Sequence, residues 1–310
     1  MAAAAGQRAV KHGAGQSGET PRLPGLTEAP GPGGAVPKGP VPFLKWVGGK
    51  RQLLPELLRR IGRLATFGAY HEPFVGGGAL FFELWSRGRL SGPVRLSDNN
   101  PNLIAAYEGV KYAVEQVIEL LREHARRHDK EHYYATRAAR PDSLAARAAR
   151  IIYLNRTCFN GLFRENSRGE FNVPMGRYVN PRICDEANLR AAAEALRDVR
   201  IDTAPFDSVV EAAAPGDLVY FDPPYHPVSA TANFTAYQRD GFGEDDQRAL
   251  AGVFRALDAN GVHVLLSNSC TEFVRGLYAD FVVENVSASR CVNSRADRRG
   301  PVWEVLVGNF

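Results

Sequence analysis

The chain has 310 residues, of which 45% are hydrophobic and 23% charged, and its formal net charge is +4. This composition excludes a fibrous or wholly disordered protein and fits one large domain or a core domain with an insertion. No apolar run approaches the roughly 20 residues that cross a bilayer, and the N-terminal residues lack the apolar core of a secretory signal. We therefore expect a cytoplasmic protein.

The positive charge is concentrated in one stretch. Residues 150–182 hold six arginines and two glutamates, while the rest of the chain holds equal numbers of basic and acidic residues. A local basic surface is typical of polyanion binding, although a charge cluster is more often only a solvated surface.

Cysteine and histidine spacing gives neither a disulfide framework nor a zinc pattern. The four cysteines lie far apart without a CxxC pair, so we expect buried, reduced thiols and no metal. His124, His128 and His132 recur at helical spacing in a run crowded with Arg and Lys, which would repel a cation. We interpret them as part of a solvated helix face.

Residues 1–40 contain nine Gly, six Pro and eight Ala and no aromatic side chain. They have little apolar surface to bury against the entropy cost of ordering, so we expect a disordered arm. Structure is predicted to begin at Val41. The following Gly-Gly-Lys triplet does not fit a phosphate-binding loop, because Leu44 and Arg51 stand where that motif needs Gly and Ser or Thr. A solvated basic segment is the alternative to a ligand-binding role there.

After Val41, short strand-like runs alternate with helical periodicity, which predicts an α/β sheet. The candidate strands are residues 69–74, 94–96, 199–203, 218–221, 262–266, 281–286 and 302–307. The last two predict a terminal hairpin, and so at least one antiparallel strand.

Between residues 100 and 200 the pattern becomes helical. The apolar positions at helical spacing are Val110, Val114, Val117, Ile118 and Leu121, and then Leu144, Ala148, Ile151 and Ile152 after a cap at Asp142 or Ser143. Residues 159–178 are rich in Gly, Asn, Arg and aromatics, which predicts a polar hairpin or ordered loop. We assign residues 41–100 and 199–310 to one domain and residues 101–198 to an inserted helical domain.

The candidate strand 218–221 leads directly into Asp222-Pro223-Pro224-Tyr225. Ligands of open α/β sheets bind beyond the carboxyl ends of strands. Because prolines have no amide hydrogen, this turn presents acceptors, namely the Asp222 carboxylate and the Pro223 carbonyl. Two acceptors beside an aromatic face suit a planar ring that carries an amino group. The alternative is a rigid turn with a packed tyrosine.

A second strand end, Glu72-Pro73-Phe74-Val75-Gly76-Gly77-Gly78, places a glycine turn before an apolar helix. Glycines there let a ligand approach the backbone. The dinucleotide fingerprint fails, because Phe81 stands where it needs Gly or Ala. The next strand ends at Asp98, which can accept hydrogen bonds from ribose hydroxyls; the alternative for Asp98 is a helix N-cap before Pro101.

These motifs in this order resemble the Dam-type DNA adenine methyltransferases, in which a target-recognition insertion separates the glycine turn from the Asp-Pro-Pro-Tyr motif. The resemblance runs from about Phe43 to the C-terminus. It includes residues 153–162, 169–174 and 229–237. It implies a Rossmann-like S-adenosylmethionine-dependent fold and methyl transfer to the exocyclic amine of an adenine flipped out of duplex DNA, with GATC as the target.

The resemblance also implies roles for single residues. Asp222, Pro223 and Tyr225 would hold the target base. The cofactor-binding residues would be Trp46, Lys50, Phe74, Gly76, Gly78, Asp98, Phe206 and Asp222. DNA would be bound by Lys45, Arg156, Phe159, Asn160, Leu162, Arg164, Asn166, Pro174, Arg177 and Tyr178. Arg164 is the candidate for a bidentate guanine contact.

The main alternatives are methylation of the cytosine amine, whose enzymes share this tetrapeptide, and a DNA-binding relative that has lost catalysis. We expect a monomer in solution, able to bind DNA in more than one copy, from a bacterial cell or a phage. The sequence does not decide between restriction protection, replication or mismatch timing, and regulation.

Overall fold

The computed structural model describes residues 39–46, 50–166, 168–228, 242–288 and 302–310. The predicted disordered arm therefore lies outside the described residues, apart from Gly39 and Pro40. The resemblance segment 229–237 and Cys291 also lie outside them.

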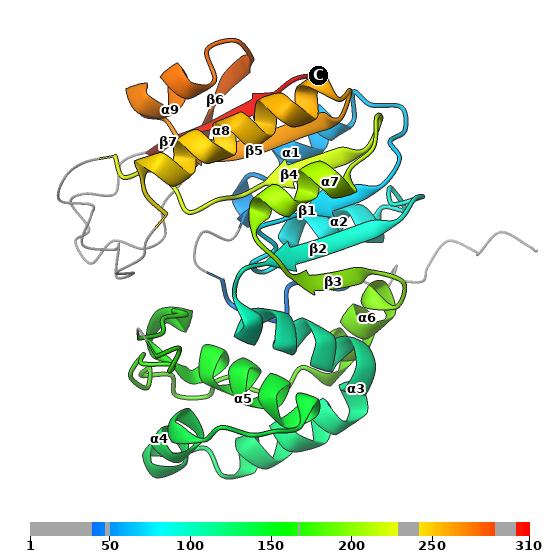
Figure 1. Cartoon of the computed structure of the whole chain (residues 1–310). Helices are drawn as coiled ribbons and strands as arrows, with labels where there is room; N and C mark the ends of the chain where they lie inside the picture. Colours follow the sequence, from blue (N-terminus) through cyan, green and yellow to red (C-terminus); the bar gives the residue numbers. More distant parts are fainter. Residues whose placement is uncertain (1–38, 47–49, 167, 229–241, 289–301) are drawn as a thin grey trace, which may run out of the picture. The chain divides into compact units, whose positions relative to one another are not determined.

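All seven predicted strands form one sheet (Figure 1). They are β1 (Tyr70–Glu72), β2 (Val94–Asp98), β3 (Arg200–Thr203), β4 (Leu218–Phe221), β5 (His263–Ser269), β6 (Val282–Ala288) and β7 (Val302–Gly308), in the order β3-β2-β1-β4-β5-β7-β6. The strands β1 to β5 pair in parallel, whereas β7 runs antiparallel to both β5 and β6. The α/β sheet and its antiparallel strand are thus confirmed.

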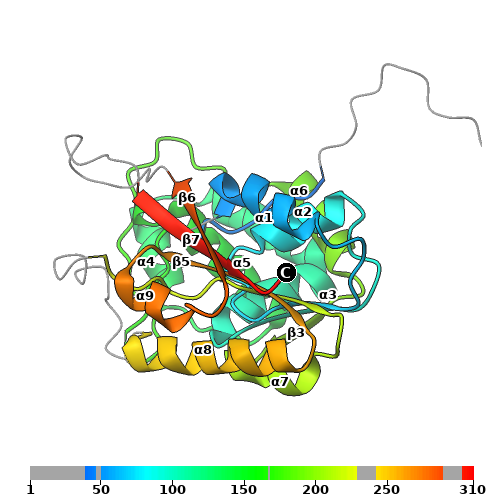
Figure 2. The same cartoon turned by 90° about the horizontal axis from the view of Figure 1, so that it is seen from above.

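Helices cover both faces of this sheet. The helices and 3-10 turns are η1 (Lys50–Gln52), α1 (Leu54–Ile61), α2 (Ala79–Ser86), α3 (Pro101–Arg126), α4 (Lys130–Ala138), α5 (Leu144–Thr157), η2 (Phe159–Gly161), α6 (Glu186–Leu196), η3 (Phe206–Ser208), α7 (Val209–Ala212), α8 (Glu244–Ala259) and α9 (Glu272–Leu277). Figure 2 shows α1 and α2 on one face and α7 and α8 on the other.

The strand β4 is buried on both faces, which explains its unbroken apolar sequence. Leu218 and Tyr220 belong to the core under α1 and α2, while Val219 and Phe221 belong to the core under α8. The chain therefore leaves the centre of the sheet immediately before Asp222.

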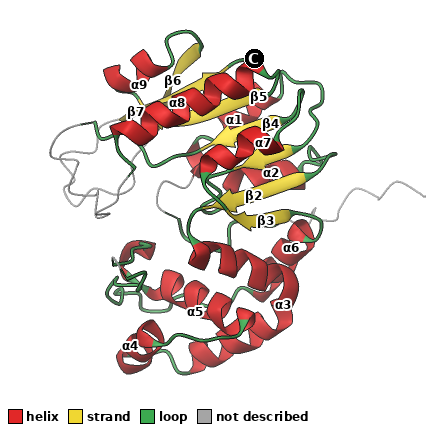
Figure 3. Ribbon diagram, viewed as in Figure 1, coloured by secondary structure: helices red, strands yellow, loops and turns green. Residues whose placement is uncertain are grey.

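Helices α3 to α6 follow β2 and precede β3, and Figure 3 shows them beside the β3 edge of the sheet. The side chain of Asn100 caps α3 by accepting hydrogen bonds from the backbone amides of Asn102 at 2.9 Å and Leu103 at 3.1 Å. The alternative interpretation of Asp98 as this cap is therefore wrong. Ser143 caps α5, as one of the two predicted caps.

The interpretation of the three histidines as a solvated face is wrong, because Tyr153 of α5 packs among them. His124 stacks on the Tyr153 ring at 4.6 Å, and its Nδ1 lies 2.8 Å from Nε2 of His132. His128 Nδ1 lies 2.9 Å from the Tyr153 hydroxyl. Burial, reinforced by His132, lowers the pKa of His124 to about 4. Among the described residues, no group of His, Cys, Asp and Glu is suited to hold a metal ion.

Residues 159–178 form the predicted hairpin or ordered loop. Antiparallel bridges pair Cys158 with Met175 and Glu165 with Phe171. Asn166 closes the turn by accepting hydrogen bonds from the amides of Arg168 and Glu170, both at 3.0 Å.

The cysteines Cys158, Cys184 and Cys270 are free, as expected, although only Cys158 is fully buried. Within the described part of the chain, none of the helices combines the length and the apolar character that a membrane crossing needs.

The packing of α3 on α5 yields a stability prediction. A Cβ atom at Gly109 would lie 2.2 Å from the Ala148 Cβ, so Gly109→Ala should destabilise the protein by about 1–3 kcal/mol through overpacking. A Cβ at Gly252 in α8 would meet nothing within 4 Å, so Gly252→Ala should add up to about 1 kcal/mol from helix propensity. Urea unfolding of both variants measures this. Equal midpoints for the two variants would contradict the close packing.

Candidate active site

The Asp222 carboxylate lies at the carboxyl end of β4, and both of its recorded side-chain partners contact the same oxygen. Lys50 Nζ lies 2.8 Å from Oδ1, and the Ser267 hydroxyl donates to Oδ1 at 2.9 Å. Among the described residues, no hydrogen bond to Oδ2 is recorded. The second oxygen is therefore available to accept a hydrogen bond from a ligand.

The ionisation of Asp222 is set by opposing effects. Burial raises the pKa of this carboxyl, whereas the charge of Lys50 and the hydrogen bonds from Lys50 and Ser267 lower it. Ser267 is in turn 3.0 Å from the Tyr220 hydroxyl. Because Ser267 donates its proton to Asp222, Tyr220 must donate to Ser267, so a chain of two hydroxyls fixes the carboxylate.

Glu72, at the end of the neighbouring strand β1, is a second acid of this region. Burial, with a further contribution from the Asp222 charge, raises the pKa of Glu72 to about 8 against the opposing hydrogen bond from Tyr70. Glu72 is therefore mostly protonated at pH 7. The Glu72 carboxyl therefore adds little negative charge beside Asp222.

The rest of the tetrapeptide is held from outside. Gln247 Nε2 donates to the Pro224 carbonyl at 2.9 Å, and Asn268 accepts from the His226 amide at 3.1 Å. No hydrogen bond to the Pro223 carbonyl is recorded in the described part of the chain. This turn thus presents the two acceptors predicted from the sequence.

The Tyr225 ring is fixed at both its hydroxyl and its face. Its hydroxyl donates to Glu304 Oε2 at 2.8 Å, and Lys50 Nζ lies 4.3 Å from the ring centroid. The alternative interpretation of the tetrapeptide, a rigid turn with a packed tyrosine, explains the fixed Tyr225 ring. It does not explain why Asp222 Oδ2 and the Pro223 carbonyl have no recorded donor among the described residues.

The glycine turn after β1 requires glycine at two positions. Gly76 and Gly78 have φ values of 46° and 65°, which favour glycine. A Cβ at Gly76 would lie 2.8 Å from the Trp46 ring, and one at Gly78 would lie 2.7 Å from the Tyr107 hydroxyl. Trp46 therefore lies directly against the turn.

Asp98 joins the same group of residues. Its carboxylate accepts from the Gly76 amide at 3.4 Å and from the Asn100 amide at 3.0 Å. Burial, opposed by these backbone hydrogen bonds, raises the pKa of Asp98 to about 6. A half-buried carboxylate beside a glycine turn suits a ligand with hydroxyl donors.

Phe74 of the glycine turn and Phe206 of η3 lie together. Their rings stack with centroids 5.4 Å apart. Phe242 contacts both rings edge-on, at 5.6 Å from Phe74 and 5.8 Å from Phe206. Together they form an aromatic cluster at the carboxyl ends of β1 and β3.

The segment before the glycine turn is not solvated. Phe43 and Leu44 are buried, and Lys50 is only 7% exposed. The Asn155 side chain makes two hydrogen bonds with the Lys45 backbone: it accepts from the Lys45 amide at 2.6 Å and donates to the Lys45 carbonyl at 2.7 Å. Arg156 Nε donates to the Phe43 carbonyl at 3.0 Å. This segment therefore links the sheet to the inserted helices.

The predicted DNA-binding residues lie on or beside the hairpin. Phe159, Asn160, Pro174, Arg177 and Tyr178 are exposed, whereas Lys45, Arg156, Leu162, Arg164 and Asn166 are half-buried.

Four of these residues, Lys45, Tyr178, Arg164 and Asn166, have side-chain contacts in this region. Lys45 Nζ lies 4.1 Å from the Tyr178 ring centroid. Arg164 Nε donates to the Asn172 side chain at 2.6 Å, and Asn166 Nδ2 donates to Glu170 at 2.8 Å.

Sequence reasoning missed Ser267, Tyr220, Glu304 and Glu72. One signal was available for Ser267, because polar residues follow the apolar run of β5 at its carboxyl end, next to β4 in the sheet. No comparable signal pointed to Glu304, which reaches Tyr225 from the antiparallel strand β7.

Comparison with known proteins decides the family. The model of D12 class N6 adenine-specific DNA methyltransferases matches residues 46–292. The chain belongs to this family. It is an S-adenosylmethionine-dependent, adenine-specific DNA methyltransferase, and its substrate is DNA. The adenine specificity decides between the two bases that the tetrapeptide alone left open.

Curated relatives match almost end to end. The type II methyltransferase M1.LlaDCHI of Lactococcus lactis subsp. cremoris is 42% identical over 277 residues, which cover 87% of this chain and 95% of the relative. The type II methyltransferase M.MjaIII of Methanocaldococcus jannaschii is 40% identical, over 87% of this chain and 99% of the relative. The DNA adenine methylase of Escherichia coli K12 is 36% identical, over 86% and 94%.

The hydroxyl chain behind Asp222 yields a pH prediction for this methyltransferase. Ser267→Ala removes a donor that favours the ionised carboxylate, so the pKa of Asp222 should rise. The carboxylate is then protonated up to a higher pH, and the acid limb of kcat/KM should move to higher pH by the same amount. Initial rates across the pH range measure it.

Ser269→Ala is the matched control, because the Ser269 hydroxyl donates to the His226 carbonyl rather than to a carboxylate. This variant should leave the position of the acid limb unchanged, and Ser267→Thr, which keeps the hydroxyl, should restore it. A Ser267→Ala profile that coincides with that of the wild type would overturn the role of this hydrogen bond.

Proposed function

We propose that this methyltransferase acts on the adenine of GATC in duplex DNA, after the base has turned out of the helix into the site at Asp222. The open acceptors Asp222 Oδ2 and the Pro223 carbonyl carry this proposal. Turning a base out of the stack costs a few kcal/mol, and such a site offsets this cost only if it binds the base by its amine and its ring face.

In this proposal the acceptors activate the amine. The nitrogen lone pair of adenine is delocalised into the ring, which makes the amine a poor nucleophile. Hydrogen bonds from its two N–H groups to Asp222 and the Pro223 carbonyl favour a pyramidal nitrogen with a localised lone pair. Tyr225, held by Glu304 and Lys50, stacks on the base and fixes the angle of approach, which can contribute several kcal/mol.

The residues at the glycine turn fit S-adenosylmethionine. The positive φ values at Gly76 and Gly78 set the course of this turn, and the Asp98 carboxylate beside it suits the ribose hydroxyls. We assign Trp46 and Lys50 to the methionine end and Phe74 and Phe206 to the adenine end. The cofactor supplies a methyl group on an already activated sulfonium.

We assign sequence recognition to the hairpin and to Lys45. Arg164 contacts one guanine through its guanidinium fork, Lys45 reaches the outer guanine, and Leu162 and Pro174 contact thymine. Phe159 and Asn160 fill the gap left by the turned-out base. Arg156, Asn166, Arg177 and Tyr178 hold phosphates, which position the duplex without reading its sequence.

Mapping of N6-methyladenine by sequencing tests the target. Unmethylated genomic DNA incubated with the protein and S-adenosylmethionine should gain the mark at the adenine of GATC, and folded Asp222→Ala protein should produce none. Arg164→Ala should also methylate sites with one guanine replaced, at a loss of discrimination of about 1–3 kcal/mol. Arg182→Ala, exposed and paired with Asp185, is the control that should keep the preference.

Methylation centred on a different sequence would overturn the GATC assignment. Unchanged discrimination in Arg164→Ala, with methylation still confined to GATC, would overturn the role of Arg164 alone.

A further inference from the structure

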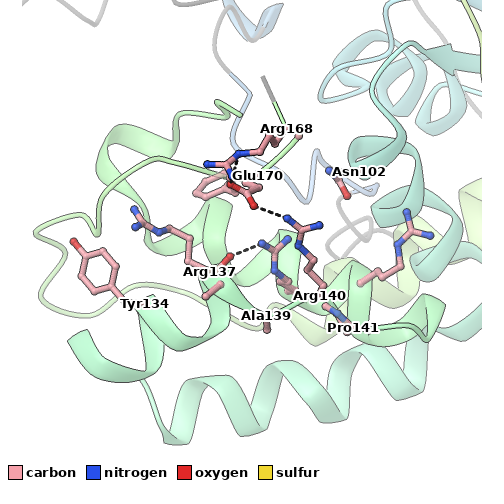
Figure 4. Close-up of a pocket in the computed structure, with 13 residues that line it drawn as sticks. Asn102, Tyr134, Arg137, Ala139, Arg140, Pro141, Arg168 and Glu170 are labelled. Carbon is pink, nitrogen blue, oxygen red and sulfur yellow. Dashed lines mark hydrogen bonds and ion pairs between the residues drawn. The ribbon is translucent and has the colours of Figure 1, made fainter. Parts of the chain in front are cut away.

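A cavity of about 460 Å³ lies in the inserted helical region, between the loop that joins α4 to α5 and the tip of the hairpin (Figure 4). Its wall includes five arginines and a glutamate, which are Arg137, Arg140, Arg147, Arg150, Arg168 and Glu170. None of the arginines is among the residues assigned above to the cofactor or to DNA. We call this feature the arginine cavity.

The positive charge of the arginine cavity exceeds its negative charge. Glu170 is the only acidic side chain among the lining residues. It pairs with Arg140 and lies 3.7 Å from Arg168 Nε, and Figure 4 shows all three at the cavity. The single carboxylate of Glu170 therefore pairs with two guanidinium groups, while three further arginines line the cavity.

Two of the remaining arginines are oriented by neutral groups. Arg150 donates to the carbonyls of Thr136 at 2.9 Å and Arg137 at 2.6 Å. Arg137 donates to the Val173 carbonyl at 3.3 Å. Carbonyls fix the direction of a guanidinium group but do not cancel its charge. Burial lowers the pKa of Arg150, and the charge of Glu165, which does not line the cavity, offsets only part of this effect. An anion in the cavity would offset the cost of keeping this charge out of water.

Arg147 is half-buried at the wall of the cavity, and the described residues include no recorded partner for it. Planar guanidinium groups bind phosphate oxygens in pairs of parallel hydrogen bonds. A half-buried arginine in a cavity with excess positive charge has the chemistry of a phosphate site.

We propose that the arginine cavity binds a backbone phosphate of the DNA substrate, outside the bases that the hairpin reads. Continuity with the hairpin favours DNA as the source of the phosphate. Arg168, Gly169, Glu170 and Phe171 of the hairpin line the cavity, so a duplex that contacts the hairpin brings its flanking backbone close. The inference rests on the proposed DNA contact of the hairpin and extends it beyond the recognition sequence.

Binding to two duplexes tests the proposal. One is short and holds little more than GATC, and the other is long with the same sequence at its centre. The double variant Arg140→Gln/Arg147→Gln should bind the long duplex several-fold more weakly than the wild type does. Its slope of log K against log salt should fall by about 0.9 for each phosphate that the variant no longer binds, while binding of the short duplex should change little.

The control is Arg248→Gln/Arg255→Gln on α8. Arg248 also pairs with a carboxylate, Glu244, and Arg255 also donates to a carbonyl, that of Leu277. This control should bind both duplexes as the wild type does, and circular dichroism checks that both double variants are folded. The long duplex without GATC should show the same weakening in the cavity variant, because a phosphate contact carries no sequence information.

Titration with inorganic pyrophosphate distinguishes the sources of the phosphate. Pyrophosphate binding that needs Arg140 and Arg147, with unchanged affinity and salt slope on the long duplex, would overturn the proposal in favour of a small-anion site. No change in either measurement would also overturn it. The sites that the wild-type protein methylates are mapped in a separate experiment. A wrong GATC assignment can therefore be distinguished from a wrong assignment of the arginine cavity.

Discussion

The proposed methyl transfer depends on keeping the half-buried Asp222 carboxylate charged at the end of the central strand β4. Taking Asp222 out of water favours its neutral form, yet a neutral acid would present a hydroxyl where an acceptor is needed. Lys50 supplies the opposite charge, and Ser267 supplies a hydrogen bond to the same oxygen. Because Glu72 is mostly protonated at pH 7, it adds little negative charge beside Asp222.

The parallel sheet brings these groups together from distant parts of the sequence. The carboxyl ends of β1, β2, β4 and β5 lie at one edge, which places the glycine turn, Asp98, Asp222 and Ser267 in one region. Only the antiparallel β7 contributes from the opposite direction, through Glu304, which fixes Tyr225. Side-chain contacts of Arg156 and Asn155 with the segment 43–45 join this region to the inserted helices that carry the hairpin.

The strand β4 was predicted with the bounds it has, because it is a short apolar run that ends at Asp222 and two prolines. The strands β1 and β3 contain charged residues, and only short parts of the runs predicted for them were apolar. The sequence also predicted the acceptors at Asp222 and Pro223, since strand ends carry ligands in such sheets. The hydroxyl chain through Ser267 and Tyr220 was missed because it joins different strands, and a register between strands is not visible in a linear pattern.

Helical periodicity had a similar limit in the inserted region. It placed three histidines on one helix face, whereas His124 belongs to α3, His132 to α4 and His128 to the connection between them, where Tyr153 packs among all three. The arginine cavity likewise combines Arg137, Arg140 and Arg147 with two arginines of the basic stretch 150–182, and only folding brings the two groups together.

The most direct test of the role of Asp222 is a crystal structure of the protein with a GATC duplex and a cofactor analogue that cannot transfer its methyl group. We predict that the turned-out adenine places its amine nitrogen within about 3 Å of Asp222 Oδ2 and of the Pro223 carbonyl. An adenine bound elsewhere, or held with its amine away from both oxygens, would contradict the mechanism.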